Sequence, residues 1–217
     1  MKKIFILGLL CLSALGGYAQ DDESDDWKVG GKHYQEWEAK QTCTEVCGVR
    51  FGSSYENAKE ILKRKYGEPD YTETDENAIV YHYKSYGGMI FTNICFCFQR
   101  DGALSYMNQC VMGYDCKTAE EAKNKRDAIW DKARSKYAAW HEDIDDNGFK
   151  YYESGCSPLG GFGNGFVIDV AKYGKPYNGC RYFARIMYGP YQYIDEEFYA
   201  ITRGMVGIAH RGRSPLS

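Results

Sequence analysis

The chain carries the same helix-start signal twice, and strand-like segments follow each copy. Ser53 with Glu56, and later Thr118 with Glu121, match the capping box, in which two side chains bond backbone N–H groups of the first helical turn. After Ser53, apolar residues recur at helical spacing until Gly67, a residue typical of helix ends. The two signals therefore predict a helix-plus-strand unit that occurs twice.

The first predicted helix is followed by three segments rich in Val, Ile, Phe and Tyr, at residues 78–84, 89–99 and 103–110. Gly87-Gly88 and Asp101-Gly102 separate them, and such dipeptides favour tight hairpins. The pattern predicts a three-stranded antiparallel meander.

The second helix is expected to be longer, because six apolar residues follow Thr118 at spacings of three, four or seven. They are Ala122, Ile129, Trp130, Ala133, Tyr137 and Trp140. Strands are then expected at residues 149–153, 166–173 and 180–188. We predict an α+β fold of two helix-plus-antiparallel-meander units, about residues 46–116 and 117–198, with the helices packed on one face of a mainly antiparallel sheet.

The N-terminus has the three-part layout of a secretory signal peptide. Lys2 and Lys3 precede an apolar run that ends in small residues near Ala19. We expect a signal peptide at 1–19, an acidic leader and N-terminal segment at 20–45, and the α+β domain with a C-terminal tail at 46–217. The run is too short to span a bilayer, so no membrane insertion is expected, and the protein is predicted to be exported to the periplasm or beyond.

Charge argues against nucleic acid as the partner. Of 217 residues, 27 are Lys or Arg and 30 are Asp or Glu, and five of the acids lie between Asp21 and Asp26. From Trp27 onward, basic and acidic residues are equal in number. A neutral body offers no basic stripe for phosphates, so neither nucleic acid nor an anionic membrane surface is expected as a partner.

Two sets of motifs carry a resemblance to known proteins. Gly48–Ser54 and Lys65–Pro69, with the helix between them, resemble the helix opening and closing of the beta-lactamase-inhibitor-protein-like fold and of small envelope-assembly lipoproteins, which are binding modules. Phe98–Gly102, Tyr106–Asn108 and Met187–Tyr191 resemble uncharacterised secreted proteins of Gram-negative gut bacteria over about residues 46–198. The first resemblance implies binding, and the second implies no activity.

Eight cysteines follow the predicted cleavage site, an even number that suggests disulfides in an exported protein. They are Cys43, Cys47, Cys95, Cys97, Cys110, Cys116, Cys156 and Cys180. We predict a Cys156–Cys180 disulfide, because the two cysteines flank the last hairpin. A two-residue turn at Asp101-Gly102 would place Cys95, Cys97 and Cys110 on one face, where buried thiols are as plausible as a bond for Cys95 and Cys97.

Asp143, Asp145 and Asn147 match the first half of a calcium loop. Ser154 stands where the loop needs a bidentate Glu, and Asn147-Gly148 is also a strong turn signal. We therefore expect a turn without calcium affinity tighter than millimolar, and no metal or cofactor.

No complete catalytic set is recognisable, since nothing local marks His33, His82, His141 or His210 as the base for a cysteine nucleophile. We predict a noncatalytic secreted module that binds a protein or glycan partner, possible versions being an inhibitor or an immunity-type protein. Its expected surface consists of sheet tyrosines, namely Tyr81, Tyr83, Tyr106, Tyr182 and Tyr188. A secreted hydrolase or thiol-dependent enzyme, and a structural envelope component, are the alternatives.

Overall fold

The computed structural model describes residues 31–72, 77–101, 104–137, 140–159 and 162–191. The chain divides into two compact units, Met1–Lys40 and Gln41–Ser217. The predicted signal peptide at 1–19 lies outside the described residues. In the predicted N-terminal segment, the described part contains a helix that the sequence did not predict, α2. Among the described residues, no helix is long and apolar enough to cross a membrane.

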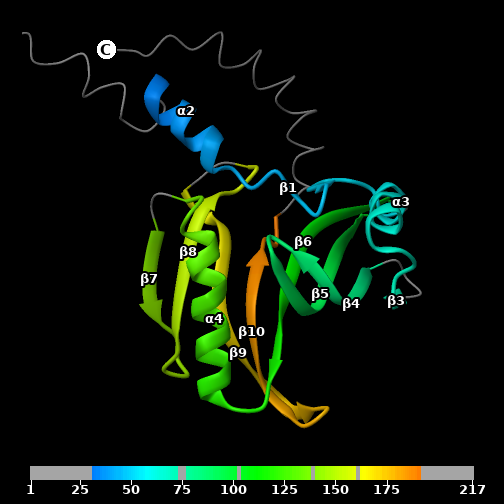
Figure 1. Ribbon diagram of the computed structural model, residues 1–217. Coiled ribbons are helices and arrows are strands. Elements are labelled where there is room, and N and C mark those ends of the chain that lie inside the picture. The colour runs from blue at the N-terminus through cyan, green and yellow to red at the C-terminus, as the bar shows by residue number, and fades with distance from the viewer. Residues whose placement is uncertain (1–30, 73–76, 102–103, 138–139, 160–161, 192–217) are drawn as a thin grey trace, which may run out of the picture. The chain divides into compact units, whose positions relative to one another are not determined.

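The described elements are three helices and ten strands (Figure 1). The helices are α2 (Lys32–Gln41), α3 (Tyr55–Tyr66) and α4 (Ala119–Ala133). The strands are β1 (Glu45–Val46), β2 (Val49–Arg50), β3 (Tyr71–Thr72), β4 (Ala78–Tyr86), β5 (Met89–Asp101), β6 (Leu104–Cys116), β7 (Trp140–Ile144), β8 (Lys150–Cys156), β9 (Phe162–Tyr177) and β10 (Cys180–Tyr188).

Eight strands form one sheet, in the order β3-β4-β5-β6-β10-β9-β8-β7. Each half is an antiparallel meander, and the last strand of each half lies at the centre. There β6 and β10 pair antiparallel from Cys110↔Tyr188 to Cys116↔Tyr182. The predicted fold of two helix-plus-meander units sharing one sheet is confirmed.

Both main helices begin at side-chain caps. Ser54, one residue after the expected position, accepts a hydrogen bond from the backbone N–H of Asn57 and begins α3. Thr118 accepts from the N–H of Glu121, whose carboxylate accepts from the N–H of Lys117. These bonds satisfy N–H groups that a helix start leaves without intrahelical partners.

The core lies between the helices and one face of the sheet. Ala58 and Leu62 of α3 are fully buried, and the ring of Tyr55 lies edge-on to Phe98, with centroids 5.0 Å apart. In the other half, Trp130 of α4 stacks on Tyr152 of β8 at 4.7 Å. Each helix thus covers its own half of the same face.

The second helix is shorter than predicted. It ends at Ala133, and the backbone N–H of Arg134 bonds to the carbonyl of Trp130. Tyr137 lies beyond the helix but is buried, and Trp140 begins strand β7, which the sequence did not predict. Trp140 still packs on Trp130, with ring centroids 5.4 Å apart, but it does so from a strand and is 47% exposed.

The predicted register of the β5–β6 hairpin is wrong. The register shifts between Cys97 and Phe98, where Asn108 of β6 is the extra residue, so Cys97 pairs with Gln109 and Phe96 pairs with Cys110. One extra residue moves every later side chain to the other face. Cys110 is therefore buried on the helix side, while Cys95 and Cys97 point to the opposite face.

The predicted Cys156–Cys180 disulfide is also wrong. Cys156 pairs with Phe162 at one end of β9, and Cys180 pairs with Tyr177 at the other end. A strand of 16 residues separates its ends by roughly 50 Å, whereas the α-carbons of a disulfide lie about 4.4–6.8 Å apart. The sequence placed both cysteines beside one hairpin because it did not reveal how long β9 is.

Candidate binding surface

A row of half-buried apolar side chains crosses the sheet face opposite α3 and α4. We call it the helix-free row, and its members, in order across five adjacent strands, are Val80, Cys95, Val111, Met187 and Val167. Each lies between two buried neighbours, as Met187 does between Ile186 and Tyr188, so its side chain points away from the core. Strands about 4.8 Å apart give the row a length of roughly 19 Å.

The row continues to both edges of the sheet through polar and aromatic residues. Tyr71 of β3 pairs with Val80, and it is exposed. At the other end Glu153 of β8 pairs with Val167 and with His141 of β7, whose Nδ1 lies 3.6 Å from the Glu153 carboxylate. One line of paired residues therefore joins all eight strands.

Charged groups beside the row bond to one another. Arg185 donates two hydrogen bonds to Asp169, at 2.7 and 2.9 Å, and this pairing raises the pKa of Arg185. Asp115 accepts from the Asn93 amide at 2.6 Å and from the Tyr173 hydroxyl at 2.5 Å. Since each charge has a partner within the sheet, these groups fix the surface around the row without needing a charged ligand.

A depression of about 420 Å³ adjoins the end of the row at Val167. Its lining includes Ser157, Leu159 and Pro190, and Glu153 is the one charged residue among the described residues that line it. The depression is large enough for a single side chain from a partner, and its carboxylate favours a basic one.

The five tyrosines predicted as a binding surface do not lie on one face. Tyr81 is fully buried, and its hydroxyl donates to the Gly67 carbonyl at 3.1 Å. Tyr83 is 75% exposed, and its backbone has a positive φ of 54°, which interrupts the regular alternation of β4. Tyr106 and Tyr182 are half-buried against the core, and Tyr188 is buried. Tyr81 and Tyr188 are therefore core residues, a correction to the expected surface.

The candidate calcium loop is the turn of the β7–β8 hairpin, not a segment that follows a helix. The Asp145 carboxylate accepts from the backbone N–H groups of Asn147 and Phe149, at 2.9 and 2.8 Å. Asp143 accepts from the N–H of Ile144 at 2.8 Å. These oxygens stabilise the turn, and no group of three or more His, Cys, Asp or Glu side chains suited to a metal ion occurs among the described residues.

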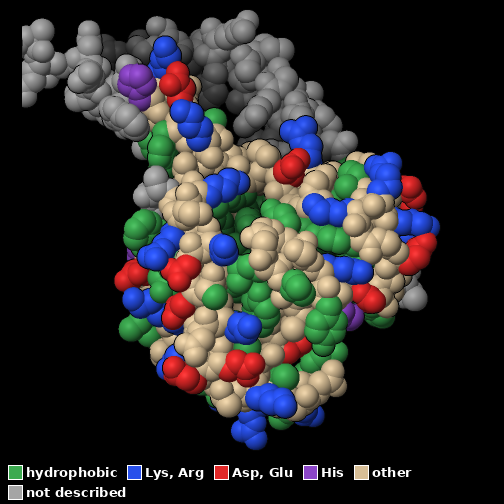
Figure 2. Space-filling model, viewed as in Figure 1, with side chains coloured by type: hydrophobic (Ala, Val, Ile, Leu, Met, Phe, Trp, Pro, Cys, Tyr) green, Lys and Arg blue, Asp and Glu red, His purple; other side chains and the backbone are tan. Residues whose placement is uncertain are grey.

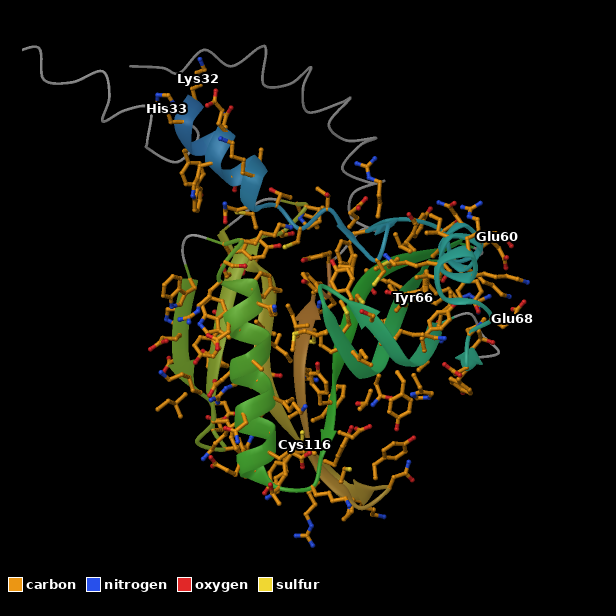
Figure 3. The ribbon with its side chains drawn as sticks, in the orientation of Figure 1. Lys32, His33, Glu60, Tyr66, Glu68 and Cys116 are labelled. Atoms are coloured by element: carbon orange, nitrogen blue, oxygen red, sulfur yellow. The ribbon has the colours of Figure 1, made fainter. Side chains whose placement is uncertain are left out.

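Most thiols are poorly placed for nucleophilic chemistry. Burial raises the pKa of Cys47 to about 11, although its bond from the Tyr66 hydroxyl opposes the shift. Burial also raises the pKa of Cys116 to about 11, and it raises the pKa of Cys110 well above the usual value. Figure 3 shows Cys116 near the start of α4 and Tyr66 at the end of α3. At neutral pH these thiols remain protonated, which makes them weak nucleophiles.

The helix-free row was not predicted from the sequence. Its members are single residues on five strands, and each alternates with buried neighbours in a way that the sequence does display. Only the register of the strands aligns them, and that register depends on the bulge at Asn108 of β6. Alternation predicts that successive side chains point to opposite faces, but it did not show that Tyr81 and Tyr188 face the core, and it could not align the strands.

Comparison with protein-family models, with curated proteins and with solved structures finds no match to this chain.

Proposed function

We propose that this protein is an exported, noncatalytic binding module that holds a protein partner on the helix-free row. The observation that carries the proposal is the unbroken apolar row over five strands, which ends at a depression with one carboxylate. Alternate strand residues face the core, so packing against the described helices does not account for the row.

The dimensions and chemistry of the surface favour a protein over a glycan. An apolar row roughly 19 Å long exceeds a small ligand and suits the core of a protein interface, which covers about 800 Å² on each partner. Glycan recognition relies on hydrogen-bonding groups, yet the nearby Asp115, Asp169 and Arg185 already bond within the sheet. A basic side chain of the partner would fill the depression beside Glu153.

The resemblance of Gly48–Ser54 and Lys65–Pro69 to binding modules supports the same class of function. The raised pKa values of the buried thiols count against a thiol-dependent enzyme. Neither argument identifies the partner.

Capture from periplasmic and surface fractions, followed by a binding assay with the purified candidate, tests the proposal. We expect Met187→Lys to abolish binding of that protein, because it places a charge inside the row, between Val111 and Val167. Ile90→Lys is the matched control, since Ile90 is 64% exposed and lies outside the row. Retained binding by Met187→Lys, or binding only to glycans on an array, would contradict the proposal.

A further inference from the structure

A second cavity lies on the opposite, helix-bearing face of the sheet. It has a volume of about 320 Å³ and lies between the end of α4, the segment 42–45 and the β4–β5 hairpin. Figure 2 shows this face, with a hollow between α4 and the hairpin. Phe91, Ile129 and Ile186 contribute apolar walls. Cavities of this size and character are typical of small-molecule sites.

The walls carry three phenol rings besides the aliphatic groups. Tyr86, Tyr137 and Tyr188 all line the cavity. The hydroxyl of Tyr137 lies 3.3 Å from the thiol of Cys43, so that pair is satisfied. Aromatic rings in the walls favour a flat aromatic ligand over a flexible chain, because rings can stack on it or meet it edge-on.

Tyr188 provides a polar group inside the cavity. The residue is only 8% exposed, and it lines the cavity. Burial raises its pKa well above the usual value, so the hydroxyl keeps its proton and can donate. The hydroxyl can therefore donate a hydrogen bond to a ligand oxygen in the cavity, and that bond would add to the affinity of the ligand.

The mouth of the cavity carries more positive than negative charge. Lys132 and Lys136 extend from the end of α4 and its following turn, and Glu45 is the acid that also lines the cavity. Both lysines are exposed, whereas Tyr188 is buried. An acidic group on the ligand would therefore lie at the mouth.

We propose that this cavity binds a small aryl carboxylic acid that carries a hydroxyl group at the far end of its ring. The ring lies between the phenol and aliphatic walls, the carboxylate meets Lys132 and Lys136, and the ligand hydroxyl accepts from Tyr188. The site is independent of the helix-free row, which lies on the other face of the sheet.

Calorimetric titration of the full chain with three matched compounds tests this site. We expect 3-(4-hydroxyphenyl)propionate to bind, 3-phenylpropionate to bind about tenfold more weakly, and tyramine, whose ammonium replaces the acid, not to bind. The tenfold difference corresponds to one hydrogen bond, about 1.4 kcal/mol.

Variants separate the two polar contacts. Tyr188→Phe should remove the preference between the two acids while leaving 3-phenylpropionate affinity within about twofold. Lys132→Gln with Lys136→Gln should weaken both acids about tenfold, and Lys172→Gln, an exposed lysine of β9, is the charge control. Absence of binding by either acid at millimolar concentration, or a hydroxyl preference that survives Tyr188→Phe, would overturn the assignment. Since the row is not altered, these outcomes do not depend on whether a protein partner exists.

Discussion

The thiols of Cys95 and Cys97 lie with their Sγ atoms 3.5 Å apart on β5, on the face that the helices leave uncovered. Residues two apart in a strand share a face, so the pair follows from the strand geometry. Cys95 belongs to the helix-free row, and both thiols are half-buried. A thiol reagent that modifies this pair therefore reports on the accessibility of the proposed binding surface.

We expect a maleimide reagent at pH 8 to label Cys95 and Cys97 in the reduced, folded protein, and to leave Cys47 and Cys110 unlabelled. Cys47 is buried with a pKa of about 11, so about one thiol in a thousand is ionised at pH 8. Peptide mapping by mass spectrometry gives the sites, and labelling in denaturant shows that all thiols can react. Labelling of Cys47 as fast as Cys95 would contradict the structure.

Asp145→Ala is expected to lower the free energy of unfolding by about 1–2 kcal/mol. The substitution removes an acceptor from two backbone N–H groups in the β7–β8 turn. Asp146→Ala is the control, since Asp146 is an exposed residue of the same turn. Urea denaturation measures both variants, and equal losses would be the contrary result.

The same pair of variants tests the calcium hypothesis. If Asp145 acts only as a turn residue, Asp145→Ala should lower the free energy of unfolding by the same amount in EDTA and in 1 mM calcium. A wild-type melting temperature that rises with calcium, and does not rise in Asp145→Ala, would show that the loop binds the ion.

Much of the fold could be predicted from the sequence because its signals are local. Thr118 with Glu121 begins a helix through bonds within one turn, and β10 has the predicted limits of residues 180–188. The predictions failed where contacts between residues far apart in the sequence determine the structure. Trp140 keeps a helical spacing but packs on Trp130 from a strand, and no local signal marks the bulge at Cys97.

The sites were less predictable than the fold for the same reason. The tyrosines were chosen by residue type and alternation, yet Tyr81 and Tyr188 contribute to the core. The helix-free row and the cavity beside Tyr188 require the register of several strands and the end point of α4. Those quantities depend on tertiary packing, which sequence periodicity does not specify.

Alkaline pH is expected to destabilise the protein, partly through Cys47. Its pKa rises from 9.0 in the unfolded reference to about 11 in the folded protein because the thiol is buried. The folded state therefore holds its proton more tightly, and the resulting stability is complete below pH 9 and is lost as pH rises towards 11.

Cys47→Gly should reduce this loss by about 2 kcal/mol between pH 8 and pH 11. Glycine suits the site because Cys47 has a φ of 58°. The measurement is the change in unfolding free energy with pH, so a constant loss of packing cancels. Cys97→Ala is the control, and an unchanged pH dependence in Cys47→Gly would refute the assigned shift.

The pairing of β6 with β10, which joins the two halves of the sheet, requires a glycine near the middle of β6. Gly113 of β6 pairs with Arg185 of β10, and a β-carbon there would lie 2.4 Å from the Ala184 carbonyl oxygen and 2.7 Å from the Phe183 ring. Backbone atoms cannot move aside cheaply, so Gly113→Ala must push the central strands apart. We expect it to lower the free energy of unfolding by about 1–3 kcal/mol.

Gly174→Ala in β9 is the matched control, because a β-carbon at Gly174 meets no heavy atom within 4 Å. There the added methyl group restricts the unfolded chain and should leave stability unchanged or raise it by about 0.4–1 kcal/mol. Urea denaturation of both variants decides the matter. Equal stabilities would mean that β6 and β10 are not as close as this pairing requires. The result would then contradict the pairing that joins the two halves into one eight-stranded sheet.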